Sequence, residues 1–227
     1  MVVESGAPEA PGPGRRRAAD LEVLGRSAAD ELDRSHGARE VALRACRSVI
    51  QACGRSIRAT HRGERAQASA VALEARAALD EAQRATQGFP SIAGAGFLHD
   101  AEKEYAEAVL CAALIEGESL PGWAGVGVAP AAWFNGLAEA ASELRRHTLD
   151  TLRGGDVARA EHLLEAMDDV YSLLVTIDFP DAVTGGLRRT TDALRAVLER
   201  TRSDVTTTML QVRLQAAIET AMGGAAE

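Results

Sequence analysis

Two glutamates, Glu104 and Glu107, carry the clearest chemical signal in the sequence. They lie three residues apart in KEYAEAV (103–109), directly before an apolar run that contains Cys111 and Leu114. On a helix this spacing places both carboxylates on adjacent turns of the face that the apolar run continues. Because two close carboxylates repel each other, one must take up a proton or a cation must lie between them. Mg²⁺ suits this arrangement, since it binds a few carboxylate oxygens and keeps waters that a phosphate can displace. Glutamates three apart also occur on solvated helices, so the spacing leaves both interpretations open.

A second acidic spot lies in LLEAMDDVYSLL (163–174), whose apolar stripe has helical spacing. Asp168 falls at the rim of that stripe and Asp169 on its far side. Periodicity therefore favours Asp168 as a half-buried group and Asp169 as a solvated one. Either aspartate could instead cap a helix or pair with a neighbouring arginine.

Basic side chains gather in RSIRATHR (55–62), in RRH (145–147) and at positions 188–189. They form either solvated faces or, where their helices converge, the lining of a phosphate channel. His61 has no partner at metal-ligand spacing, so we interpret it as a phosphate donor. The residues predicted to bind nucleic acid are Arg55, Arg58, His61, Arg62, Arg145 and Arg146.

The elements that must position these side chains are helices, because strong helix formers dominate a chain of 227 residues. The pattern predicts seven helices, at about 18–35, 38–62, 64–86, 98–116, 130–153, 157–177 and 185–221. Pro130 suits a first helical turn, and Asp156 is a candidate N-cap. We therefore predict an all-α bundle with one domain over 18–222, preceded by a disordered tail over 1–17 that ends in three arginines.

Charge and cysteine content narrow the function classes. The net charge of −8 argues against a protein that coats nucleic acid non-specifically, although a basic patch can lie inside an acidic shell. Cys46 and Cys53 are seven residues apart, share a helical face and are predicted to be core residues rather than a disulfide. An odd cysteine count without a signal peptide favours the cytoplasm, and no apolar run is long enough to predict a membrane helix.

Several of these stretches together resemble the translin and Trax family over about residues 30–210. KEYAEAV is similar to the Gln-Glu-Tyr-Val-Glu-Ala-Val signature of the Trax branch, and RSIRATHRGE (55–64) resembles the basic end of the family's second helix. VAPAAWFNGLAEAASELRR (128–146) resembles its Val-Thr-Pro-Ala-Asp-Tyr-Leu-x-Gly stretch with the following Gly-Glu-Leu-x-Arg. LLEAMDDVYSLL is similar to its Leu-x-x-x-x-Asp-Gly-Phe helix, and residues 180–204 fit its last long helix.

The resemblance implies a seven-helix, translin-like fold that assembles into a hollow octamer binding single-stranded RNA, or single-stranded DNA, inside. Trax-type subunits are Mg²⁺-dependent endoribonucleases, whereas translin-type subunits bind nucleic acid and lack the acidic site. Carried over by motif, the catalytic and metal-binding residues are Glu104, Glu107 and Asp169, with Asp168 in reserve and Mn²⁺ as an alternative ion. The resemblance thus selects Asp169 where periodicity favours Asp168.

Three functions remain open on the sequence. Retention of both glutamates favours a metal-dependent nuclease acting on single-stranded RNA over a non-catalytic binding shell of the translin type. A helical scaffold without nucleic acid is favoured only by the acidic balance. The family's Gly after the Asp is Val170 here, its Gly before Glu-Leu is Ser142, and its Asp before Tyr is Ala132.

Overall fold

Residues 13–223, which the computed structural model describes, fold into nine helices and no strand, so the all-α prediction is confirmed. The long helices are α1 (Pro13–His61), α2 (Arg65–Thr86), α4 (Phe97–Glu116), α6 (Pro130–Arg153), α7 (Val157–Leu174) and α9 (Leu187–Gly223). Three helices of four residues lie in the breaks that the sequence predicts, namely α3 (Pro90–Ala93), α5 (Trp123–Val126) and α8 (Asp181–Thr184).

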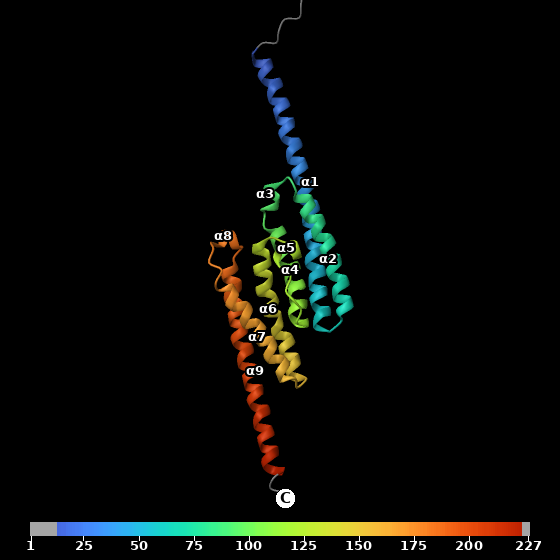
Figure 1. The fold of residues 1–227 in the computed structure, drawn as a ribbon. Coiled ribbons are helices and arrows are strands. Elements are labelled where there is room, and N and C mark those ends of the chain that lie inside the picture. The colour runs from blue at the N-terminus through green and yellow to red at the C-terminus, as the bar shows by residue number, and fades with distance from the viewer. Residues whose placement is uncertain (1–12, 224–227) are drawn as a thin grey trace, which may run out of the picture.

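The six long helices form three neighbouring pairs, α1 with α2, α4 with α6, and α7 with α9 (Figure 1). The α4–α6 pair lies in the middle, so side chains at its junction are supported from both sides. The Ser56 hydroxyl donates to the Ala68 carbonyl (2.9 Å) within the first pair, and Arg145 joins α6 to Asp204 of α9 (2.8 Å). The first part of α1 and the last part of α9 extend beyond the bundle at opposite ends (Figure 1).

Helix α1 is one continuous helix of 49 residues, which corrects the prediction of separate helices at 18–35 and 38–62. Gly37 lies between the two predicted helices and stays helical, because a single glycine costs a helix only about 1 kcal/mol relative to alanine. Residues 13–17 of the expected disordered tail are helical, and residues 1–12 lie outside the described part of the chain.

Two local predictions for helix starts are confirmed. Pro130 begins α6, where its missing N–H removes no helical hydrogen bond. Asp156 caps α7, and its carboxylate accepts a hydrogen bond from the Arg159 backbone N–H at 2.9 Å.

Small buried side chains are frequent on α4 and α6, and Ala106 lies at the contact between the two helices, opposite Gly136. Ala106, Ala108, Cys111, Ala138 and Ala141 are at most 1% exposed. Small residues allow two helix axes to approach closely, which brings polar side chains at the edge of the contact within reach of each other. The distance between α4 and α6 therefore sets the distances between polar side chains at the edge of their contact.

The three cysteines are buried and unpaired, as predicted for Cys46 and Cys53. Burial, with the charges of Glu104 and Glu107, raises the pKa of the Cys53 thiol to about 12. None of the described helices is long and apolar enough to cross a membrane.

Candidate functional site

Three carboxylates meet at the α4–α6 junction. Glu104 and Glu107 of α4 and Glu139 of α6 each offer an oxygen within 4.8 Å of the others, and we call them the carboxylate cluster. Glu107 is 9% exposed, while the side chains of Glu104 and Glu139 keep 28% and 30% of their surface. The cluster is therefore buried on one side and open to solvent on the other.

Gly136 allows α6 to lie close enough to α4 for the cluster to form. A Cβ at this position would stand 2.7 Å from the Lys103 carbonyl oxygen and 2.9 Å from the Glu107 backbone nitrogen. Only a glycine fits such an approach without displacing backbone. Glu139 lies three residues further along α6, so the close contact carries its carboxylate to Glu104 and Glu107.

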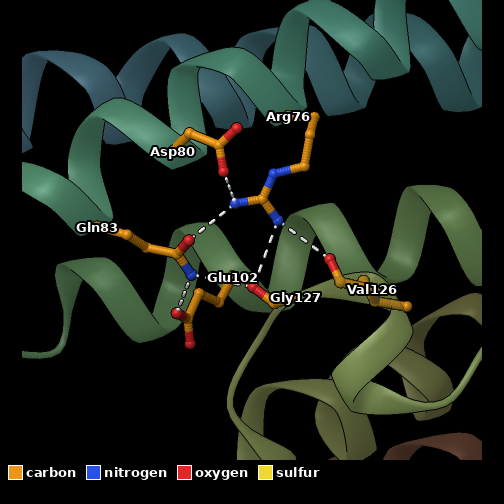
Figure 2. Close-up of polar contacts among 6 residues, drawn as sticks. All are labelled: Arg76, Asp80, Gln83, Glu102, Val126 and Gly127. Carbon is orange, nitrogen blue, oxygen red and sulfur yellow. Dashed lines mark hydrogen bonds and ion pairs between the residues drawn. The ribbon is translucent and has the colours of Figure 1, made fainter.

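A polar network fixes where α6 begins relative to α4 (Figure 2). Glu102 of α4 is buried and accepts hydrogen bonds from the Gln83 amide (2.7 Å) and from the Ala129 backbone N–H (3.1 Å), just before α6. Arg76 of α2 donates to the carbonyls of Val126 (3.0 Å) and Gly127 (3.3 Å) at the end of the connecting loop. These contacts hold the end of the loop beside the first turns of α4. Helix α6 therefore starts next to the start of α4 and runs in the same direction, which places Glu139 beside Glu107.

Mutual repulsion and burial shape the electrostatics of the cluster. Burial, reinforced by the charges of Glu139, Glu104 and Glu143, raises the pKa of Glu107 to about 8. Burial also raises the pKa of Glu104, with Lys103 opposing the shift and Glu139 adding to it. At neutral pH the cluster therefore holds a proton, as expected of close carboxylates that lack sufficient positive charge.

Lys103 lies against the same cluster. Its ammonium donates to Glu139 at 2.9 Å and is 3.6 Å from Glu104. Burial alone would lower the pKa of Lys103, but the hydrogen bond and charge of Glu139, with the charges of Glu104 and Glu107, raise it above its ordinary value.

His61 and Glu143 extend the site toward α1. His61 Nε2 lies 2.8 Å from a Glu143 oxygen, and the His61 side chain is 2% exposed. The hydrogen bond from His61 holds the pKa of Glu143 below its ordinary value. Burial opposes this shift, and the positive charges of His61 and Arg146 add to it. A buried ring cannot meet a phosphate from solvent, so His61 does not present the phosphate donor that the sequence predicts.

The structure does not bring Asp169 to the two glutamates. Asp169 is exposed on α7 and does not belong to the carboxylate cluster. Asp168 is exposed too, not half-buried as periodicity suggests, and pairs with Arg202 of α9 at 2.7 Å. The reason is that α7 turns its apolar stripe, including Met167 and Val170, toward α6 and α9, which leaves both aspartates on the outer side.

Most of the predicted basic side chains already have partners. Arg55 pairs with Glu74 and Arg62 with Glu64, while Arg145 binds Thr201 and Asp204. Arg58 and Arg146 are exposed and have no ion pair within residues 13–223. Arg146 lies near enough to Glu143 to lower that group's pKa. Of the arginines predicted to bind nucleic acid, these two therefore have no ion-pair partner among the described residues.

Sequence reasoning missed Glu139, Glu143 and the role of Lys103. A signal for the two glutamates exists in LAEAASEL (137–144), where they lie four apart among small residues. Charged groups on a helix face that is otherwise alanine are candidates for a semi-buried site.

The donor set of the cluster fits a hard divalent cation. All three donors are carboxylates, the oxygen ligands that Mg²⁺ and Mn²⁺ prefer, and the exposed side leaves room for water ligands. The proton held by Glu107 indicates that the cluster has unmet negative charge, which such an ion would neutralise.

No family model matches the chain. AfC3PO in complex with duplex RNA is 33% identical, with a TM-score of 0.75 over 85% of this chain and 97% of that chain. AfC3PO alone gives a TM-score of 0.74 at the same identity, covering 98% of that chain. The apo form of NeC3PO, at 15% identity and a TM-score of 0.73, shares the fold.

One sequence relative is an uncharacterised protein from Methanocaldococcus jannaschii. It is 27% identical over 121 residues, or 53% of this chain and 54% of that protein. The chain thus spans about half the length of the curated relative that it matches.

Proposed function

The chain belongs to the translin/Trax family, and on that premise we propose that it is a cytoplasmic, Mg²⁺-dependent endoribonuclease of the Trax type. The observation that carries the proposal is the carboxylate cluster of Glu104, Glu107 and Glu139 on the rim of the α4–α6 junction. A binding-only subunit has no use for three carboxylates held together at a tight helix contact, two of which, Glu104 and Glu107, have a raised pKa. Their repulsion costs stability that an ordinary helix surface would not lose.

Each residue of the site has a definite part in this proposal. Glu104, Glu107 and Glu139 would hold Mg²⁺, or Mn²⁺ in its place, with Asp169 no longer needed as third ligand. The bound ion would lower the pKa of a water for in-line attack on phosphorus and offset charge on the phosphate oxygens. Arg58 and Arg146 would bind the RNA backbone, and His61 would keep the Glu143 carboxylate in place through their 2.8 Å contact.

We propose that this chain binds RNA, because a related protein of the same family does. AfC3PO binds duplex RNA in the structure described above. We expect this chain to bind RNA through exposed arginines near the cluster, with single strands as the cleaved form and single-stranded DNA as a further ligand. Because the net charge is −8, this basic surface can cover only a limited patch of the protein.

We also propose a homo-oligomer, with a hollow octamer as the expected assembly. The projecting part of α1 exposes Leu21, Leu24 and Leu32, and that of α9 exposes Leu214 and Ile218. These apolar stripes lie at opposite ends of the bundle, so one copy cannot cover its own stripes (Figure 1). Other copies of the chain would bury them.

Cleavage of end-labelled RNA tests the proposal directly. Wild-type protein is incubated with single-stranded and with duplex RNA, in Mg²⁺ and in EDTA, and binding is measured on the same samples. We expect internal cuts in the single strand in Mg²⁺ and none in EDTA. RNA binding without Mg²⁺-dependent cutting would leave the alternative, a non-catalytic binding protein of the translin type.

A matched pair of variants tests the third carboxylate. Glu139→Gln is expected to lower the cleavage rate at least about a hundredfold, because it removes an ion ligand. Asp169→Asn should change the rate less than about threefold, since Asp169 lies outside the cluster. Initial rates at saturating RNA measure both. Loss of activity in the Asp169 variant alone would return that residue to the site and remove Glu139 from it.

A further inference from the structure

Lys103 is the single lysine of the chain, beside 24 arginines among the 25 basic residues. It is placed inside the carboxylate cluster, where its ammonium is 2.9 Å from a Glu139 oxygen and 3.6 Å from a Glu104 oxygen. The one lysine ammonium therefore lies where the negative charge of the site is concentrated.

The chemistry of lysine suits this place better than that of arginine. An ammonium is a compact point charge, close in shape to a small cation, whereas a guanidinium is a planar fork. The lysine side chain is also flexible, and at Lys103 it keeps 21% of its surface exposed. The ammonium can therefore leave the cluster for solvent without disturbing the α4–α6 contact.

We propose that Lys103 is a built-in counter-cation of the carboxylate cluster, which has to withdraw from Glu139 and Glu104 before a divalent cation can bind there. The inference rests on the proposed metal site. An ion bound to the same carboxylates would lie only a few ångströms from an ammonium that stayed, and the two positive charges would repel. Lys103 thus stabilises the metal-free protein and lowers the affinity for the ion.

Substitution of Lys103 tests this competition. Binding of Mn²⁺ is measured by electron paramagnetic resonance, at the same pH and salt concentration for wild type and variants. We expect Lys103→Gln to bind Mn²⁺ at least about tenfold more tightly than wild type. Arg202→Gln, which removes an equal charge from the ion pair with Asp168, should change the affinity less than about twofold.

A second measurement needs no variant. Because the chain has one lysine, acylation of Lys103 can be followed by peptide mass spectrometry apart from the N-terminal amine. We expect Mg²⁺ to accelerate the acylation of wild-type Lys103 several-fold, since the displaced ammonium becomes solvent-exposed. Slower or unchanged acylation in Mg²⁺ would overturn the proposal.

Mn²⁺ binding and RNA cleavage together distinguish the role of Lys103 from the proposed nuclease activity. Equal or weaker Mn²⁺ binding by Lys103→Gln would overturn the counter-cation role and leave the nuclease proposal intact. Tighter binding by the variant with no RNA cleavage by wild type would uphold the role of Lys103 and reject the nuclease. Absence of Mn²⁺ binding in both proteins would overturn both.

Discussion

Replacing Glu107 with Gln is expected to lower Mg²⁺-dependent RNA cleavage at least about a hundredfold and to stabilise the metal-free protein at alkaline pH. The first effect follows from the loss of a buried ligand oxygen between Glu104 and Glu139. The second follows because a glutamine amide resembles the protonated acid in shape and carries no charge into the cluster. The variant thus loses cleavage activity but gains stability, as expected where a functional site holds carboxylates that repel each other.

The direction of the pH effect is set by the pKa of Glu107. In the folded protein this pKa is about 8, against an ordinary value of 4.5. Between these values the folded chain holds a proton that the unfolded chain has released. The free energy of unfolding of metal-free wild type therefore falls as the pH rises from about 4.5 to about 8 and the contribution is fully lost above that. The loss is of the order of a few kcal/mol.

Thermal unfolding in EDTA measures this effect. We expect Glu107→Gln to have a melting temperature roughly 5–10 °C above wild type at about pH 9, with a smaller difference near pH 5. Glu165→Gln, which removes an exposed carboxylate of α7, should match wild type at both values. Added Mg²⁺ should stabilise wild type at about pH 9 more than the Glu107 variant, because the ion binds the folded wild type preferentially. An equal pH dependence in wild type and Glu107→Gln would contradict the assignment of the buried proton to Glu107.

The helices were predictable because their signals are local. Apolar periodicity, Pro130 and Asp156 mark where helices start, and each acts within a few residues of its own position. The predicted break between residues 35 and 38 was wrong, because the glycine there lowers helix propensity only slightly and α1 is continuous through it, packing against α2 and α4. The sequence predicted a loop between the helices at 98–116 and 130–153. It did not predict that this loop runs back along α4 to the start of that helix.

The third carboxylate was not predictable from spacing because it depends on contacts between distant segments. Glu139 joins Glu107 only since Glu102 and Arg76 tie the loop before α6 to α4 and α2 (Figure 2). The alanine-rich stretch around Glu139 marks it as a candidate for a semi-buried group, but no local pattern shows which distant residues it meets. The resemblance to the family selected Asp169 by its place in a motif, whereas the fold puts that residue on the outer side of α7.

Gly136 should be the most sensitive backbone position of the site, and Gly136→Ala is the second substitution for which we expect a large effect. The added Cβ would lie 2.7 Å from the Cβ of Ala106 and from the Lys103 carbonyl oxygen, and 2.9 Å from the Glu107 backbone nitrogen. Two of these three atoms belong to the backbone of α4, so no side-chain rotation relieves the clash. Helix α6 has to move away from α4, and Glu139 moves with it.

The expected cost combines two opposing terms. Alanine favours a helix over glycine by about 1 kcal/mol, while overpacking of a tight helix contact costs typically 1–3 kcal/mol or somewhat more where backbone is displaced. We expect a net loss of about 1–2 kcal/mol in urea unfolding, together with at least about tenfold weaker Mn²⁺ binding by the folded variant. Gly37→Ala is the matched control, because a Cβ at that helical position of α1 meets nothing within 4 Å. It should gain stability of about 0.5–1 kcal/mol and bind Mn²⁺ as wild type does. If Gly136→Ala bound Mn²⁺ normally despite reduced stability, the close α4–α6 approach would stabilise the bundle without setting the spacing of the carboxylates.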